Sequence, residues 1–241
     1  MLDKLEKKYC IPFSRCDRHY KMRISEILNV FMDIATEHAG ALGCGQPVLD
    51  KQKLFWMVGY SALQINELPK HNDEVLLTTW PEAVHRGLSY RYYKMEKDGK
   101  VLVEGKTLWM LFDYTTMAIA SSERSIIVNL PDNKDKCCTF RKNPLIDTYE
   151  KHEKVYDYVV GSNDVDVGFH MNNVSYVKSL FGAFNCDEID SMPIKTFEIK
   201  FISQAKEGNT LSIYKRNVED GIAMGAFIED NKVAVLAKIG F

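Results

Sequence analysis

The chain has 241 residues, 46% of them hydrophobic and 27% charged, a composition typical of a globular protein with one large domain or two small ones. The formal net charge of −2 argues against nucleic-acid binding, which needs a basic face. The first residues lack the apolar core of a secretory signal, and no stretch approaches the roughly 20 apolar residues of a membrane helix. We therefore expect a cytoplasmic protein with no membrane or nucleic-acid partner.

The cysteines give no sign of a metal or disulfide framework. The chain has 6 of them, irregularly spaced and without a C-x-x-C pair. This pattern favours reduced thiols over disulfides or zinc. We expect no metal and no cofactor.

The first half of the chain is predicted to form one strand, one helix and then a series of strands. Tyr9–Cys16 has the pattern of a strand. Apolar residues recur at helical spacing over Ser25–Leu42, with Ser25 as a candidate N-cap. Among the turn signals that follow, Asp98-Gly99 is typical of a hairpin. The predicted strands are Leu54–Ile65, Glu74–Trp80, Leu88–Met95, Val101–Asp113 and a short Met117–Ala120.

The second half repeats this order after an interruption. Residues 131–136 are polar and rich in turn signals, which indicates a linker. We predict an N-terminal unit at 1–125, a linker at 126–150 and a C-terminal unit at 151–241, sizes that fit ordinary domains. The predicted elements are a strand Lys154–Val160, a helix Asn173–Phe184, and strands Lys195–Ile202, Thr210–Arg216, Ile222–Glu229 and Lys232–Phe241.

A deeply apolar helix followed by a meander of half-buried strands suggests one architecture for each unit. The antiparallel sheet can bury its apolar face by curling around the helix. Two such units can join their sheets edge to edge, which also removes exposed strand edges. The predicted fold class is therefore α+β, a double hotdog in which each unit is an antiparallel sheet wrapped around a long central helix.

The segment 163–176 concentrates the residues that can carry chemistry. It contains Asp164, Asp166, His170 and the pair Asn172-Asn173, between a β-like run and an apolar helical run. At a helix start, free backbone N–H groups and the positive end of the dipole favour negative charge. Such a turn can hold a carboxylate and an imidazole beside donors aimed at one point, as acyl transfer requires. The simpler alternative is that these residues only cap the helix.

Over roughly residues 8–241 the chain resembles the acyl-acyl-carrier-protein thioesterases of plants and bacteria. The resemblance implies a double hotdog with much of the acyl tunnel in the N-terminal unit and the active site mostly in the C-terminal unit. Its firmest part is the pattern D-x-D-x-x-x-H-x-N-N that begins at Asp164. Further matches, in the family's order, are Asp33–Ala39 with Leu42-Gly43, Thr79-Trp80-Pro81, Arg86, Arg91, Asp98-Gly99, Trp109 and Asp113.

This resemblance implies roles for the polar residues of the second unit. Asp166 is expected to activate water or to attack the thioester carbonyl, and His170 to bond the reacting groups or steady Asp166. A partly desolvated carboxylate has a raised pKa and is a better base. Backbone N–H groups from Gly168 to Asn172 are expected to form the oxyanion hole, with Gly168 opening the backbone path. The catalytic candidates are Asp166, His170, Asn172 and Gln204.

Two positions depart from the family pattern. The family usually reads D-x-N-x-H, but Gly168 occupies the Asn position. Many members carry Glu and then Cys further on, where this chain has Gln204 and Ala205. The missing Cys excludes a thiol nucleophile there and favours a mechanism centred on a carboxylate. Gln204 can orient water but cannot act as a base, and an ordinary strand-end polar residue is the alternative.

The remaining candidates concern substrate binding, for which the set is Arg86, Arg91, Trp56 and Gly168. Arg86 and Arg91 are expected to be exposed, where they either engage an acidic carrier protein or are solvated charges on a strand face. Trp56 is expected to line the acyl tunnel or to belong to an ordinary core. The predicted function is hydrolysis of fatty acyl-acyl-carrier protein, with the carrier protein as partner and a homodimer as one assembly. The alternatives are an acyl-coenzyme A thioesterase and a non-catalytic acyl-binding hotdog protein.

Overall fold

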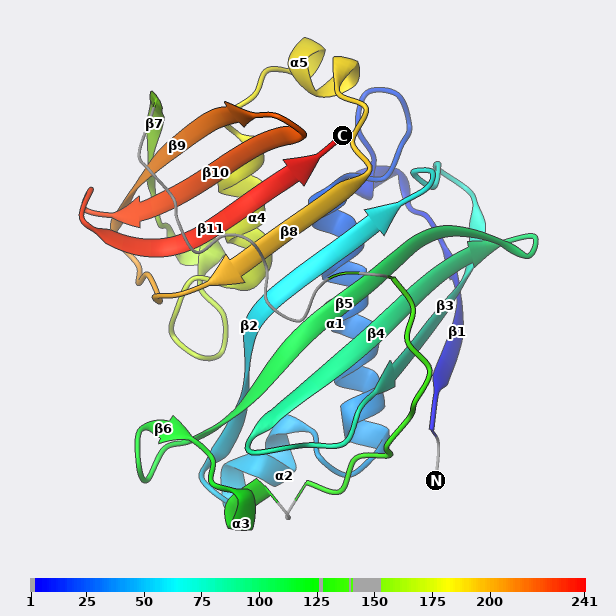
Figure 1. Ribbon diagram of the computed structural model, residues 1–241, viewed down its shortest axis with the longest axis vertical. Coiled ribbons are helices and arrows are strands. Elements are labelled where there is room, and N and C mark those ends of the chain that lie inside the picture. The colour runs from blue at the N-terminus through cyan, green and yellow to red at the C-terminus, as the bar shows by residue number, and fades with distance from the viewer. Residues whose placement is uncertain (1–2, 126–127, 139, 141–152) are drawn as a thin grey trace. The chain divides into compact units, whose positions relative to one another are not determined.

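The computed structural model describes residues 3–125, 128–138, 140 and 153–241. The chain divides into two compact units, Met1–Thr139 (unit 1) and Phe140–Phe241 (unit 2), each with an antiparallel sheet and helices of its own (Figure 1). Of the predicted linker 126–150, the structure describes residues 128–138 and 140, and the rest lies outside the described residues. Among the helices of the described ranges, none is long and apolar enough to cross a membrane.

The sheet of unit 1 has the strand order β1-β3-β4-β5-β2, with all neighbours antiparallel and β6 beside the end of β5. A two-residue turn joins β4 to β5, and both of its residues, Asp98 and Gly99, have the positive φ that such a hairpin needs. The strands are β1 (Leu5–Cys10), β2 (Leu54–Ile65), β3 (Glu74–Pro81), β4 (Leu88–Lys97), β5 (Lys100–Asp113) and β6 (Ala118–Ile119). The helices are α1 (Ile24–Ala41), α2 (Gln46–Lys51), α3 (Ser122–Ser125) and the 3₁₀ helix η1 (Phe13–Arg15).

Helix α1 lies against one face of this sheet (Figure 1). Of its 18 residues, 10 are buried, so it is a core helix with little free surface. Phe31 stacks on Tyr93 of β4 with ring centroids 4.8 Å apart. The close approach of α1 to the sheet depends on Gly105 of β5, because a Cβ at this position would lie 2.7 Å from the ring of Phe31.

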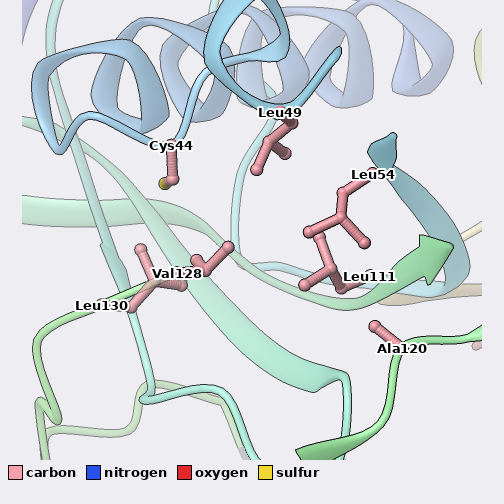
Figure 2. Close-up of a cluster of buried hydrophobic side chains, with 7 residues drawn as sticks. All are labelled: Cys44, Leu49, Leu54, Leu111, Ala120, Val128 and Leu130. Carbon is pink, nitrogen blue, oxygen red and sulfur yellow. The ribbon is translucent and has the colours of Figure 1, made fainter. Parts of the chain in front are cut away.

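A cluster of buried apolar side chains fills the part of unit 1 next to α2 (Figure 2). Leu54 of β2 and Leu111 of β5 face each other there, with Leu49 of α2 beside them. The thiol of Cys44 belongs to the same cluster, and burial raises its pKa. The cluster is therefore a packed core, completed by Ala120, Val128 and Leu130.

Unit 2 has the same plan on a smaller scale. Its antiparallel sheet has the order β8-β11-β10-β9-β7, and helix α4 packs on it through Phe181, whose ring lies 5.4 Å from that of Phe197. The strands are β7 (Glu153–Val159), β8 (Thr196–Phe201), β9 (Thr210–Val218), β10 (Gly221–Ile228) and β11 (Lys232–Gly240). The helices are α4 (Asn173–Phe181), α5 (Cys186–Ser191) and the 3₁₀ helix η2 (Ser162–Asp164).

Most predicted elements are present, and the differences occur at their ends. The first strand ends at Cys10 rather than Cys16, because the chain enters η1 directly after Pro12. Ser25 is not an N-cap: it lies buried inside α1, whose N-cap is Arg23. The second helix stops at Phe181 instead of Phe184, since Asn185 and Glu188 form a capping box that starts α5.

Candidate active site

The segment between η2 and α4 forms a tight turn that places Asp166 and His170 opposite each other. The backbone N–H of Asp166 donates to the carbonyl of His170 at 3.0 Å, and Val165 pairs with Met171 just outside them. Phe169 at the tip has a φ of +60° and donates its N–H to the Asp166 carbonyl. The turn thus places the backbones of the two residues that the sequence singled out directly opposite each other.

The carboxylate of Asp166 is exposed, so the expectation that it is partly desolvated is wrong for the protein without substrate. The turn projects from unit 2, and the neighbouring side chains of Val167 and Phe169 are 94% and 83% exposed. One carboxylate oxygen accepts the N–H of Gly168 at 2.8 Å, which fixes the side chain over the turn. Apolar side chains therefore flank a carboxylate that faces water.

The predicted oxyanion hole is largely occupied by internal hydrogen bonds. Gly168 and Phe169 donate their N–H groups to Asp166, Met171 donates to Ala205, and Asn172 donates to Asp164. The predicted role of Gly168 in exposing an N–H is therefore wrong for this conformation. Donors without such a bond lie further on, because the N–H groups of the first helical turn, such as that of Asn173, have no intrahelical acceptor.

Two polar residues of the motif have structural partners. Asn172 is the N-cap of α4, and its side-chain oxygen accepts the N–H of Ser175 at 2.9 Å. Asp164 accepts the Tyr158 hydroxyl at 2.9 Å and the Gly161 N–H at 2.9 Å. Burial, and then the bond to Asp164, raise the pKa of Tyr158 to about 12. Asp164 therefore ties the turn to β7, and Asp166 is the carboxylate directed to solvent.

Gln204 lies on the segment that supports this turn. Met171 donates its N–H to the Ala205 carbonyl at 2.9 Å, and the Tyr176 hydroxyl accepts the Ala205 N–H at 2.7 Å. The side chain of Gln204 is exposed. Tyr176, which the sequence did not single out, is buried, and this burial together with the charge of Asp166 raises its pKa to about 12. A tyrosine one turn after an N-cap was the signal that could have found it.

Among the substrate-binding candidates in unit 1, Arg86 and Trp56 lie in different surroundings. Arg86 is exposed in the connection between β3 and β4, where the bridge between His85 and Leu88 closes a tight turn, and its φ is +50°. Trp56 is half-buried beside the cluster of Figure 2 and donates its indole N–H to the Cys44 carbonyl at 3.3 Å. Its ring meets that of Trp109 edge-on. Trp56 is thus part of the unit-1 core.

Arg91 is not an exposed arginine, and both interpretations that placed it in solvent are wrong. It is 4% exposed, because its position on β4 points toward α1. One guanidinium nitrogen lies 3.0 Å from Nδ1 of the buried His38 and 3.3 Å from the Thr79 hydroxyl. Since a guanidinium only donates, Nδ1 of His38 accepts and this ring is neutral. Burial lowers the pKa of Arg91.

The turn that carries Asp166 has a counterpart in unit 1. Asp17 occupies the place of Asp166, and its carboxylate accepts the N–H of His19 at 2.8 Å, as Asp166 accepts that of Gly168. Because a histidine takes the same path, the backbone does not require glycine at position 168. The backbone pairings of the two turns also match. Given with the unit-1 pair first, they are Cys16–Met22 and Val165–Met171, Asp17–Lys21 and Asp166–His170, Tyr20–Asp17 and Phe169–Asp166, Met22–Pro69 and Met171–Ala205, and Arg23–Arg15 and Asn172–Asp164.

The two turns share the residues that build the backbone turn and differ in the residues that could take part in a reaction. Both have an aspartate at the start and a methionine that joins the supporting segment. They differ where chemistry is possible, since unit 2 has His170 and Asn172 in the places of Lys21 and Arg23. The aspartate alone is therefore explained by the turn, and the pairing with histidine is specific to unit 2.

Known proteins resemble both units. Residues 3–129 match the acyl-ACP thioesterase N-terminal domain, and residues 148–240 match the acyl-ACP thioesterase C-terminal domain. The acyl-[acyl-carrier-protein] hydrolase FATB3 of Cuphea viscosissima is 23% identical over 187 residues, which are 73% of this chain and 43% of that protein. The chain spans about half the length of the curated relatives it matches.

Solved structures show the same fold. An acyl-ACP thioesterase from Bacteroides thetaiotaomicron has a TM-score of 0.89 at 20% identity, covering 99% of this chain and 98% of its own. The 12:0-ACP thioesterase from Umbellularia californica has a TM-score of 0.78 at 17% identity, covering 98% and 96%. The fold is that of these thioesterases, the double hotdog. With both domain models matched in order, the chain belongs to the acyl-ACP thioesterase family.

Proposed function

We propose that this protein hydrolyses the thioester of fatty acyl-acyl-carrier protein and releases the free fatty acid. The observation that carries the proposal is the turn of unit 2, which holds Asp166 and His170 opposite each other at the start of α4. Relatives named as acyl-carrier-protein hydrolases or thioesterases support the substrate class. The unit-1 copy of the turn has Lys21 in place of the histidine, so hydrolysis is assigned to unit 2.

In the proposed mechanism Asp166 takes a proton from water as the water oxygen adds to the thioester carbonyl. The resulting oxyanion is stabilised by N–H groups of the first turn of α4, where the helix dipole is positive. Collapse of this adduct breaks the carbon–sulfur bond, and the leaving thiolate takes the proton that Asp166 accepted from water, which restores the carboxylate. The alternative, attack by Asp166 itself, passes through an anhydride that water then hydrolyses.

The acyl chain is proposed to change the surroundings of Asp166. Val167 and Phe169 flank the carboxylate and are exposed without substrate. An acyl chain lying over them would remove water from Asp166, which would raise its pKa and strengthen it as a base. The partial desolvation predicted from the sequence is therefore assigned to the substrate complex. Gln204, on the supporting segment, is proposed to orient the water.

The finer organisation of the fold is also part of the proposal. We infer that each sheet wraps around its helix, that unit 1 holds much of the acyl chain and that unit 2 catalyses. The largely apolar buried residues of α1 support a role of unit 1 in acyl binding. The boundaries 1–125 and 151–241 remain predictions for these two functional parts.

The decisive experiment replaces Asp166 with Asn and uses Asp17→Asn as its matched control. Both variants alter the same carboxylate-to-N–H bond in the same kind of turn. Asp166→Asn is expected to lower the turnover of acyl-carrier protein roughly a hundredfold or more, the usual contribution of a general base. Asp17→Asn should keep near-normal turnover. Equal activity of the two variants would remove Asp166 from its proposed role.

A second candidate function is acyl binding without catalysis. It is favoured by one observation: position 168 is a glycine, which has no side chain, and position 204 is a glutamine, which cannot act as a base. A thiol-release assay on acyl-carrier protein and acyl-coenzyme A separates the candidates. Retained fatty-acyl binding with no release of either thiol would select the binding protein, and a preference for coenzyme A would select the other hydrolase.

A further inference from the structure

Unit 1 exposes aromatic rings on its copy of the catalytic turn. Phe13 is 66% exposed and Tyr20 is 57% exposed. Both rings contact His71 on the supporting segment, with centroid distances of 5.6 Å for Phe13 and 6.5 Å for Tyr20. Tyr20 has a φ of +61°, a conformation that costs a non-glycine residue energy and directs its ring to this surface.

Basic residues lie on the same two segments as these rings, together with the carboxylates of Asp17 and Asp73. Lys21 and Lys70 are partners in an antiparallel bridge, and both are exposed. Like charges directly opposite each other on neighbouring strands are destabilising. Arg23, which is also exposed, follows two residues later. This concentration of positive charge occurs in a chain whose net charge is −2, so it does not reflect the average composition.

The fold does not require this chemistry, because unit 2 builds the same frame with other residues. The bond from Lys70 N–H to the Asp73 carboxylate has a counterpart from Lys206 N–H to the Asn209 side chain, both 2.8 Å long. In unit 2, Ser162 occupies the place of Phe13 and Phe169 that of Tyr20. Glu207 occupies the place of His71, and His170 that of Lys21. The turn itself therefore does not explain Phe13, His71 and Lys21, whereas the exposed ring of Tyr20 and the lysine at position 70 recur in unit 2 as Phe169 and Lys206.

We infer that the surface formed by Phe13, Tyr20 and His71 with Lys21, Arg23 and Lys70, here named the aromatic–basic patch, docks the acidic carrier protein. This inference rests on the proposed function, which supplies a carrier protein as the substrate's bearer. Exposed rings amid positive charge match the anatomy of a protein interface with an acidic partner, in which aromatic anchors give affinity and charges steer encounter. The patch is an extended surface on two segments, which fits a protein better than a single phosphate.

Charge reversal tests the patch without weakening the turn. Lys21→Glu and Lys70→Glu, each made singly, convert the repulsion across the bridge into attraction, so both variants are expected to fold. Each should raise the KM for acyl-carrier protein about tenfold at low salt and leave turnover of the same acyl chain on N-acetylcysteamine unchanged. Lys206→Glu, the counterpart in unit 2, is the matched control and should leave the KM for acyl-carrier protein unchanged.

The aromatic part is tested by Phe13→Ser, which introduces the residue that unit 2 has at this place in the turn. It should weaken carrier binding with no loss of small-thioester turnover. Direct binding of carrier protein, measured by calorimetry, tests the patch even if no thioester is hydrolysed. Failure of hydrolysis with binding that depends on Lys21 would overturn the proposed function alone and support the patch.

Three results would overturn the inference. One is equal binding of carrier protein by the wild type and Lys21→Glu. Another is a larger loss from Arg86→Glu, which would place docking at the turn between β3 and β4. The third is binding of anionic lipid vesicles, dependent on Lys21, in place of carrier protein.

Discussion

The buried residue Arg91 shows how a single side chain can differ from what its sequence suggests. A sequence with alternating polar residues along β4 predicts charge in solvent, yet this guanidinium is directed to His38 inside unit 1. The register of the strands determines which way Arg91 points. Arg91 pairs with Thr107 on β5, and Thr107 pairs with Ser61 on β2. These three polar residues therefore share the face of the sheet that packs on α1. Such a polar seam is visible only once the strands are aligned.

The contact between Arg91 and His38 gives a testable stability effect. His38→Leu removes an acceptor from a buried charge and should lower the free energy of unfolding by about 1–3 kcal/mol. Arg91→Met should cost less, because it removes the charge and leaves only a neutral acceptor unpaired. The double variant should cost less than the sum, since the two residues contact each other. Urea unfolding measures all three, and additive losses would show that the two side chains are not coupled.

The start of α4 provides the prediction at the scale of an element. Asn172→Ala removes the N-cap bond to Ser175 and should cost about 1 kcal/mol of stability. Asn172→Ser keeps a good cap but has no amide, so it should restore stability. If Asn172 acts only as a cap, the Asn172→Ser variant should recover the turnover of acyl-carrier protein together with its stability. Low turnover in a stable Asn172→Ser protein would instead make the amide a direct participant in catalysis.

Asn185 is the matched control for this cap. It caps α5 in the same way, with its oxygen accepting the Glu188 N–H at 2.9 Å. Helix α5 has no buried residue, so Asn185→Ala should fray it with little change in global unfolding. Equal destabilisation by Asn185→Ala and Asn172→Ala would contradict the view that α4 is the core helix of unit 2.

Helices and strands were predictable from the sequence where a long apolar pattern dominates. They were less predictable where a local turn sets the end of an element. Strand β2 was predicted residue for residue, because its apolar run is long and bounded by turn signals. Helix α5 was missed, although the capping box from Asn185 to Glu188 was present, since a six-residue helix leaves almost no periodicity. The path through η1 was also missed, because the strand pattern of Tyr9–Cys16 outweighed the proline at position 12.

For the whole molecule, the sequence indicated two units of similar plan but not the depth of their likeness. The turns around Asp17 and Asp166 have matching backbone–backbone hydrogen bonds with little identity beyond the aspartate and a methionine. Backbone bonds do not depend on side-chain identity, so a repeat of this kind leaves almost no trace in the sequence. Its value is that each unit serves as a control for the other, which separates residues that build the turn from those that differ by function.

Stability at acid pH is a property of the whole chain, because carboxylates with lowered pKa values occur in both units. The largest effect is on Asp113, whose pKa is lowered to about 2 by hydrogen bonds from Thr115 and then by Arg124 at 2.8 Å. Hydrogen bonds from lysines lower the pKa of further carboxyl groups, namely Asp135 by Lys4, Asp157 by Lys154 and Asp220 by Lys238. An unfolded chain protonates such groups near pH 4.

The sign of the pH effect follows from this difference. Above about pH 4 the carboxyl groups are ionised in both states, and their native partners stabilise the fold. As pH falls from about 4 to 2, the unfolded state binds protons first, so the free energy of unfolding should decline. Urea titrations across this range should show a smaller decline for Asp113→Asn, and Arg124→Gln should act in the same direction by raising the pKa of Asp113. If the free energy of unfolding declines equally with falling pH in the wild type and both variants, Asp113 does not govern the loss of stability at acid pH.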